Sequence, residues 1–180
     1  MDHPATATSY NNIGVVYANL GDYAKALVYS LKALEIREKA LGKEHIETVQ
    51  SYHDIGSMYR SIGDYQNALI YRKKELDYYI QTQGETNLET AQAYNNVGAQ
   101  YRELEQYDKA VEYITKAYDI ADNIGDDIAK AVYLNRLGRT FAAMGDLSTA
   151  HDKFHSAINL LPEDHPVAKD SRERLEKLSK

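Results

Sequence analysis

Apolar residues recur along the chain at the three- and four-residue spacing of an amphipathic helix. The first such stripe consists of Tyr10, Ile13, Tyr17 and Leu20. This spacing places the side chains on one face of a helix. The stripe ends at Gly21 and Asp22, where a glycine can close one helix and an aspartate can cap the next. The pattern therefore predicts a helix, a tight turn and a second helix from about Tyr23 to Leu41.

The same helix pair returns at a fixed interval. Gly14, Gly56 and Gly98 are 42 residues apart, and Gly138 follows after 40. Three more positions repeat around each glycine: Tyr10, Tyr52, Tyr94 and Leu134; Tyr17, Tyr59, Tyr101 and Phe141; Ala26, Ala68, Ala110 and Ala150. Positions that keep one register in successive copies indicate an internal repeat. We expect repeats at about residues 7–45, 49–87, 91–127 and 131–162.

Both ends of the chain follow the same repeat. Residues 2–4, DHP, stand where residues 44–46, EHI, stand one period later, so we expect the chain to start in a loop between repeats, as part of a longer array. Residues 166–179 are too polar to be buried on two sides. They are expected to form a capping helix with Val167, Leu175 and Leu178 on its apolar face. Four helix pairs and this cap make nine helices.

One turn departs from the pattern. The third repeat has Glu105 and Gln106 where the other repeats have glycine and aspartate. A residue with a side chain that adopts the left-handed conformation costs roughly 1 kcal/mol. We therefore expect a different turn at this point.

These residues resemble the tetratricopeptide repeat (TPR), which carries Leu-Gly, an aromatic residue, Ala, Phe, Ala and Pro at fixed offsets. The fourth repeat fits with Leu134, Leu137, Gly138, Phe141, Ala150, Phe154, Ala157 and Pro162. The 42-residue spacing, with ALEIREKALGKEH at 33–45, is similar to the repeats of kinesin light chains and their bacterial relatives. The 40-residue step, with IGDDIAKAVYLNRLG at 124–138, is more similar to the Leu-Gly-Asn adaptor family. The resemblance implies an all-α fold: one right-handed TPR solenoid over residues 1–180, with a concave groove.

Composition narrows the classes of partner. The net charge is −6 and no basic block offsets it, so we expect neither nucleic acid nor an anionic membrane as a partner. The chain has no cysteine, which excludes disulfides, cysteine-based zinc sites and thiol catalysis. The first ten residues lack the basic and apolar regions of a signal peptide, and no stretch is long enough to cross a membrane. We expect a cytoplasmic protein.

The face opposite the apolar stripe of each first helix is the candidate functional surface, because in the resembling family this face lines the groove and holds a peptide. Read at equivalent offsets, it contains Asn11, Asn12, Asn19, His53, Arg60, Asn95, Asn96, Arg102, Asn135, Arg136 and Arg139. An asparagine amide offers a donor and an acceptor, as a peptide backbone does. Arginine can bind a carboxylate with two parallel hydrogen bonds. The alternative is that these asparagines are solvated or fix one repeat against the next.

We therefore expect a scaffold or adaptor that binds a protein or peptide with acidic groups or a free C-terminal carboxylate. Arg60 and Arg102 occupy the same offset and form the best candidate pair; an ion pair of Arg102 with a nearby glutamate is the alternative. A structural spacer, a self-associating segment of a longer array, or a regulatory domain of a larger signalling protein remain alternative functions.

Little in the sequence indicates catalysis. His151 and His155, in HDKFH, lie at i and i+4 as in the H-E-x-x-H zinc motif, but the repeat explains their neighbours and no motif places a third ligand. Arg72 and Glu75 stand at core-facing positions, where we expect a partly buried ion pair whose arginine stem covers apolar surface. No phosphate-binding glycine loop occurs. We expect no enzyme and no cofactor.

Overall fold

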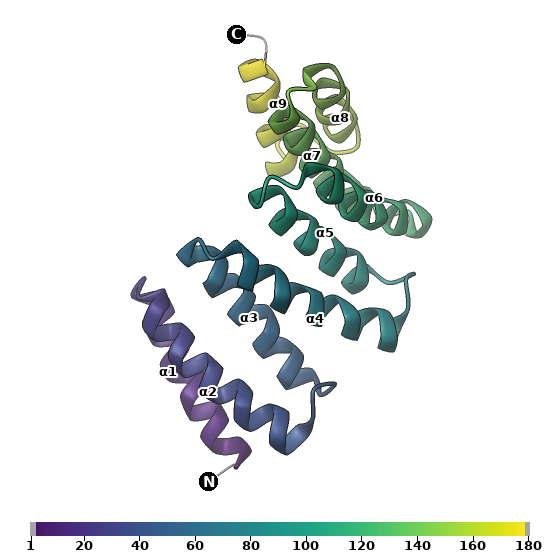
Figure 1. Cartoon of the computed structure of the whole chain (residues 1–180). Helices are drawn as coiled ribbons and strands as arrows, with labels where there is room; N and C mark the ends of the chain where they lie inside the picture. Colours follow the sequence, from purple (N-terminus) through teal and green to yellow (C-terminus); the bar gives the residue numbers. More distant parts are fainter. Residues whose placement is uncertain (1–2, 179–180) are drawn as a thin grey trace. The chain divides into compact units, whose positions relative to one another are not determined.

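The helices begin and end close to the positions that the repeat pattern predicts. In the computed structural model, which describes residues 3–178, there are nine α-helices and no strand. The helices are α1 (Pro4–Asn19), α2 (Tyr23–Leu41), α3 (Ile46–Ile62), α4 (Tyr65–Gln83), α5 (Leu88–Glu103), α6 (Tyr107–Ile124), α7 (Asp127–Met144), α8 (Leu147–Asn159) and α9 (Pro166–Leu178) (Figure 1). Residue 2 of the first predicted loop and residue 179 of the predicted cap lie outside the described residues.

The chain divides into two compact units, Met1–Thr82 and Gln83–Lys180. In the first unit, α1 packs on α2 and α2 packs on α3 (Figure 1). In the second unit, α5 packs on α6, α6 on α7, α7 on α8 and α8 on α9. Within each unit, these helices thus pack on their neighbours in the chain, as stacked helical repeats require.

Glycine and aspartate separate the helices as predicted. Gly63 and Gly145 follow α3 and α7 with φ angles of 89° and 84°, the left-handed region that glycine adopts without steric cost. Asp22 and Asp146 accept a hydrogen bond from the backbone N–H three residues later, at 3.1 and 3.0 Å. These aspartates satisfy one free N–H at the start of α2 and of α8.

The expectation of a different turn in the third repeat is wrong. Glu105 adopts the left-handed conformation with φ 57°. Its N–H donates to the Arg102 carbonyl at 2.9 Å, and the N–H of Gln106 donates to the Tyr101 carbonyl at 2.9 Å. The same two bonds close the turn at Gly63, at 3.1 and 2.9 Å. The bonds of this turn, and the helix pairing that it permits, therefore outweigh the conformational cost of a glutamate.

Replacing Glu105 with glycine is expected to raise the free energy of unfolding by about 0.5–1 kcal/mol, because the left-handed strain disappears and the extra freedom of the unfolded chain offsets part of the gain. Urea unfolding of the two proteins measures the difference. Glu176→Gly, on the exposed side of α9, is the control and should lower stability by about 1 kcal/mol. A destabilised Glu105→Gly variant would show that the glutamate side chain itself stabilises the turn.

Each unit has its own core of small and aromatic residues. In the first unit Leu34, Val49, Tyr52 and Ile55 form a buried cluster between α2 and α3. In the second unit the buried cluster is Ala131, Leu134 and Ala157, and Val167 of α9 packs against it. Alanines at the repeated positions are fully buried, which lets paired helices approach closely.

Tyrosine pairs join the two helices of three repeats, in accordance with the packing predicted for Tyr29, Tyr71 and Tyr113. The ring centroids lie 5.5 Å apart in Tyr17–Tyr29, 5.6 Å in Tyr59–Tyr71 and 5.2 Å in Tyr101–Tyr113. A lysine lies over the tyrosine rings of each of these repeats: Lys32, Lys74 and Lys116. These lysines are 42 residues apart, a repeated position that the sequence analysis did not identify. The ammonium groups lie 5.1–5.6 Å from the rings of the second-helix tyrosines, within the range of a cation–π interaction.

Candidate peptide-binding surface

The candidate residues of the first unit lie on α1 and α3. Asn12, Asn19 and Arg60 are exposed, and Asn11 is half-buried. Among the described residues, none of these four side chains makes a hydrogen bond or an ion pair. Their polar groups are therefore not used within the fold, and their role in binding a peptide stays a prediction.

His53 has a different environment, because it belongs to a buried polar network. Its Nδ1 lies 2.8 Å from Oε1 of Glu75 and 2.7 Å from Nη1 of Arg72. Arg72 donates to Oε2 of Glu75 at 2.8 Å and to the Ser57 hydroxyl at 2.6 Å. Arg72 and Glu75 are each 5% exposed, so the predicted ion pair is present and more deeply buried than expected. The network ties α3 to α4, and 42% of the His53 side chain stays exposed.

In the second unit, the asparagines at the same offset as His53 are buried. Asn135 donates to the Asp170 carboxylate at 2.9 Å and to the Ser171 hydroxyl at 2.8 Å, which joins α7 to α9. Asn95 is 7% exposed, and its Oδ1 has no hydrogen-bond partner among the described residues. For Asn135 the structure favours the alternative that the sequence left open, a contact that fixes neighbouring helices. Asn96 is half-buried on α5.

Arginines from three helices meet in the second unit. Arg102 of α5, Arg139 of α7 and Arg174 of α9 line a cavity of about 410 Å³. Arg102 pairs with Glu103 at 2.7 Å, and Arg174 pairs with Asp170 at 2.8 Å. The first of these pairs is the ion pair that the sequence offered as the alternative for Arg102.

Arg139 differs from the other two arginines of the cavity. It is half-buried and makes no ion pair or hydrogen bond among the described residues. Burial, followed by the positive charges of Arg102, Arg174 and Arg136, lowers the pKa of Arg139 to about 10. The guanidinium is still charged at neutral pH. It is a half-buried cation without an ion pair, and its neighbours are three other arginines and the Asp170 carboxylate.

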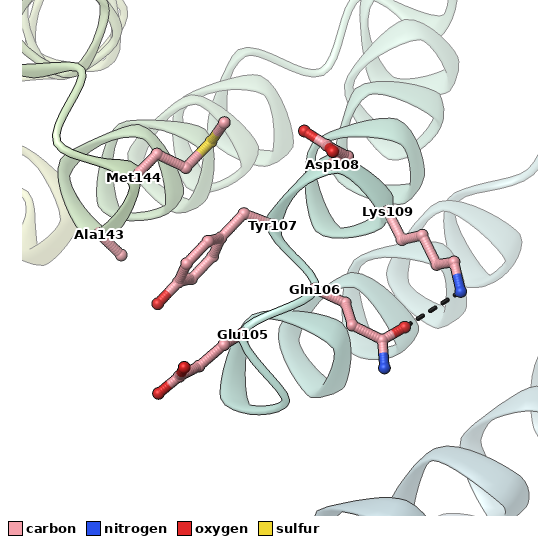
Figure 2. A pocket seen from close by; sticks show the side chains of 7 residues that line it. All are labelled: Glu105, Gln106, Tyr107, Asp108, Lys109, Ala143 and Met144. Atoms are coloured by element: carbon pink, nitrogen blue, oxygen red, sulfur yellow. Dashed lines mark hydrogen bonds between the residues drawn. The ribbon is translucent and has the colours of Figure 1, made fainter.

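A second cavity, of about 520 Å³, adjoins the first. Glu105, Tyr107 and Ala143 line both cavities. Figure 2 shows the Tyr107 ring between Ala143 and Glu105, with its hydroxyl on the same side as the Glu105 carboxylate. Lys109 donates to the Gln106 side chain at 3.0 Å on the other side of the turn. The two hollows together form a polar surface beside the α5–α6 turn.

Arg174 is the residue of this surface that sequence reasoning missed, because α9 was interpreted only as a cap. The relevant sequence feature is Asp170, four residues earlier on the same helix face, which Arg174 binds and which also accepts from Asn135. Burial raises the pKa of Asp170, and the bonds from Arg174 and Asn135 outweigh burial and lower the pKa below its ordinary value. This carboxylate therefore holds α7 and α9 together in its charged form.

The two histidines on α8, His151 and His155, do not belong to a group of described residues that could hold a metal ion. The rings of His151 and His155 lie 4.5 Å apart, and Nδ1 of His151 lies 3.7 Å from the Asp152 carboxylate. Residues 3–178 contain no group of three or more histidines, aspartates and glutamates arranged to hold a metal ion. In the same residues, no helix is long and apolar enough to cross a membrane.

Comparison with solved structures shows the fold. A Podosopora anserina protein of nearly identical TPR-like repeats, described as a kinesin light chain, is 19% identical, with a TM-score of 0.80 over 99% of this chain and 87% of that one. BtubC from P. vanneervenii is 21% identical, with a TM-score of 0.78 over 88% of this chain; the chain spans only 64% of BtubC. MamA from Desulfovibrio magneticus RS-1 is 23% identical, with a TM-score of 0.65, over 88% of this chain and 76% of that one. The all-α solenoid fold predicted from the repeats is confirmed.

Comparison of sequences shows the family. No curated protein matches the chain. The family model of the tetratricopeptide repeat matches residues 2–81 and 89–163, which is most of the chain. The match includes all four repeated glycines and the candidate residues of α1, α3, α5 and α7, whereas α9 with Arg174 lies outside it. The chain therefore belongs to the tetratricopeptide repeat family.

Proposed function

We propose that the chain is a non-catalytic protein-interaction module that binds a partner segment through a carboxylate. Tetratricopeptide repeats in general mediate protein–protein interactions, on surfaces formed by their stacked helices. The observation that carries the finer proposal is the unpaired Arg139 in the cavity that it shares with Arg102. An unpaired, half-buried cation favours an anionic ligand, and the planar guanidinium matches a carboxylate with two parallel hydrogen bonds.

The partner segment is expected to lie along the first helices of the repeats. In the second unit these are α5 and α7, whose Asn96 and Arg136 are further candidate contacts outside the lining of the arginine cavity. In the first unit, Asn11, Asn12, Asn19 and Arg60 offer polar groups that are not used within the fold. Asparagine amides can bond the main chain of a peptide without selecting its side chains. Specificity would then come from the arginines.

Binding of acidic peptides tests this function. A fluorescent peptide rich in aspartate and glutamate is expected to bind, and its asparagine and glutamine counterpart is expected to bind at least about tenfold more weakly, because only the carboxylates pair with arginine. Fluorescence anisotropy at low and high salt measures both affinities, and the affinity for the acidic peptide should fall as salt rises.

Two single variants locate the contact. Arg102→Ala is expected to weaken binding of the acidic peptide, and Arg60→Ala tests whether the first unit takes part. Equal affinity for the acidic and amide peptides would rule out a carboxylate-binding surface. Unchanged affinity in both variants would remove these arginines from the site.

A further inference from the structure

We infer that α1 is an interface between two copies of this chain, which pack the same face of α1 against each other. This inference does not depend on the proposed function, because the interface involves no carboxylate. It starts from three apolar residues of α1 and its C-cap: Ile13, Val16 and Leu20 are 39%, 57% and 75% exposed. Contiguous apolar patches on a protein surface commonly mark sites that another molecule covers.

The later repeats show that this face is one that stacked helices bury. Two of its positions are buried in every later repeat: the Ile13 position at Ile55, Val97 and Leu137, and the Val16 position at Met58, Gln100 and Thr140, all at most 7% exposed. The helix α2 covers α3, whereas no described helix of the first unit covers α1 from this side. Another surface must therefore cover α1 if its face is to be buried as in the later repeats.

Charge distinguishes α1 from the other described helices. Its 16 residues include no aspartate, glutamate, lysine or arginine, whereas each of the other eight helices carries at least two such residues. A charged helix placed on this apolar face would lose water from its charges and find no counter-ion, which is costly. The surface that fits α1 is therefore apolar and uncharged. Among the described helices only α1 itself offers such a face, so its partner is the α1 of a second copy.

The junction between α2 and α3 shows why a helix like α2 is a poorer partner. Nη1 of Arg37 in α2 donates to the Ser51 hydroxyl at 2.7 Å, and its Nε lies 3.5 Å from the Glu47 carboxylate. One repeat earlier, α1 has Ala5 in place of Glu47. A helix like α2 on α1 would thus bury its arginine without this carboxylate. The composition of α1 is better matched to a second α1.

The exposed face has the spacing of a helix–helix seam. Ser9, Ile13, Val16 and Leu20 are separated by four, three and four residues, the alternation that coiled coils use. Asn12 and Asn19 are exposed beside this seam, so the rim is polar and uncharged. A two-fold contact brings one surface against an identical surface, so a charged seam would repel its own copy. The uncharged seam of α1 avoids this repulsion.

Sedimentation velocity of the full chain over a range of concentrations tests the interface. The wild type is expected to pass from monomer to dimer as its concentration rises. Val16→Asp should raise the dissociation constant at least about tenfold, because each dimer would then bury two unpaired carboxylates. Circular dichroism should show that the variant is folded, since residue 16 is exposed in the single chain.

Val28→Asp is the matched control for this substitution. Val28 of α2 is 52% exposed, and so is Ile70 at the same position one repeat later, although α3 and α4 follow in the stack. This position therefore lies off the face that neighbouring repeats cover. Val28→Asp should leave the dissociation constant unchanged.

A single cysteine tests the symmetry of the contact, because the chain has no cysteine of its own. Val16 lies near the middle of the seam, so in a two-fold pair it lies close to its own copy. Val16→Cys should therefore form a disulfide-linked dimer under mild oxidation, with a yield several times that of Val28→Cys. A head-to-tail contact would place residue 16 against a surface without cysteine, and the two yields would then be equal.

Salt separates this inference from the proposed function. Each copy carries a net charge of −6, so two copies repel each other and salt screens this repulsion. Dimerisation should therefore strengthen or stay constant as salt rises, whereas binding of the acidic peptide should weaken. A dimer that weakens with salt would be held by charges, which would overturn the uncharged seam.

The remaining outcomes also divide clearly. A wild type that stays monomeric at every concentration would assign the face of α1 to another helix or another protein and overturn the inference. A dimer that persists in Val16→Asp, or equal cross-linking of the two cysteine variants, would overturn it as well. Each of these results would leave the proposed function standing. Equal affinity for the acidic and amide peptides, with the dimer intact, would overturn the proposed function alone.

Discussion

Replacing Glu75 with alanine is expected to lower the free energy of unfolding of the first unit by about 3–5 kcal/mol. The carboxylate is the counter-ion of Arg72, and both side chains are 5% exposed. Without Glu75 the Arg72 guanidinium stays buried and keeps no carboxylate within ion-pair distance among the described residues. An uncompensated buried charge is among the most costly defects that a single substitution can create.

The surroundings of Arg72 explain why the side chain cannot turn toward water. Its stem lies over Gly56, and a Cβ at that glycine would meet Nε of Arg72 at 3.2 Å and its Cδ at 3.4 Å. Ser57 and His53 hold the other end of the guanidinium. The helices α3 and α4 therefore enclose the charge between them. Relief in the variant would require a local opening of this helix pair.

Acid should reduce the difference between the wild type and a Glu75→Gln variant. Burial raises the pKa of Glu75, but the bond with His53 and the charge of Arg72 outweigh burial and hold the pKa below its ordinary value of 4.5. The charged form is therefore favoured by folding. Its contribution is complete well above pH 4.5 and is lost as the pH falls through the lower pKa of the folded state. Urea unfolding at pH 7 and pH 3 measures this change.

A double replacement supplies the matched control. The third repeat has Ile114 and Ala117 at the two equivalent positions, and both are buried there without any charge. Arg72→Ile combined with Glu75→Ala copies this pair into the second repeat. Replacing a buried ion pair by apolar residues is often neutral or stabilising, so the double variant should be more stable than Glu75→Ala by at least about 2 kcal/mol. A double variant as unstable as the single one would show that packing at Glu75, and not charge, causes the loss.

The fold could be predicted from the sequence because every repeat carries the same pattern of apolar residues, glycine and alanine. Tyr52, Gly56 and Ala68 repeat residues found 42 positions earlier and later, so an error in one repeat is corrected by the others. The turn at Glu105 shows the limit of local rules. Its conformational cost of roughly 1 kcal/mol is smaller than the tertiary packing that the turn allows.

Burial on the first helix could not be predicted from its stripe alone. Ile13 and Val16 are 39% and 57% exposed, whereas Ile55 and Met58, one repeat later, are 0% and 7% exposed. The helix α2 covers α3, and no described helix of the first unit covers the same face of α1. Periodicity identifies the apolar face of a helix, but burial depends on whether a neighbour is present.

The candidate surface was harder to predict because one helix face serves two purposes. Asn11 and Asn135 occupy the same repeat position, yet Asn11 makes no hydrogen bond within the described residues and Asn135 joins α7 to α9. Sequence spacing cannot distinguish these roles, since each depends on the helix that follows. Arg174 was not predicted as part of the candidate surface for the same reason. Its contribution depends on the distance between α9 and α7, which no repeat position encodes.

Replacing Phe154 with alanine is expected to lower the free energy of unfolding of the second unit by about 3–5 kcal/mol, the usual cost of removing a large buried aromatic side chain. Phe154 of α8 is 1% exposed and packs directly against Gly138 of α7. A Cβ at Gly138 would lie 2.7 Å from Cε1 and 2.8 Å from Cδ1 of this ring. Position 138 therefore has no room for a side chain while the Phe154 ring is present. Gly138→Ala alone should cost about 1–3 kcal/mol through overpacking.

The two substitutions are expected to be strongly non-additive. The three nearest atoms to an added Cβ at Gly138 all belong to Phe154, at 2.7, 2.8 and 3.0 Å, so Phe154→Ala removes the closest contacts of Gly138→Ala. In that background Gly138→Ala should stabilise the protein by up to about 1 kcal/mol, because alanine favours the helix more than glycine does. A double-mutant cycle by denaturant unfolding measures this coupling.

The corresponding cycle at Gly98 and Ile114 is the control. An added Cβ at Gly98 would lie 3.1 Å from the Ala110 carbonyl oxygen, which remains after Ile114→Ala. Gly98→Ala should therefore stay unfavourable in that background. Additive losses at Gly138 and Phe154 would mean that the ring is not what excludes a side chain at this glycine.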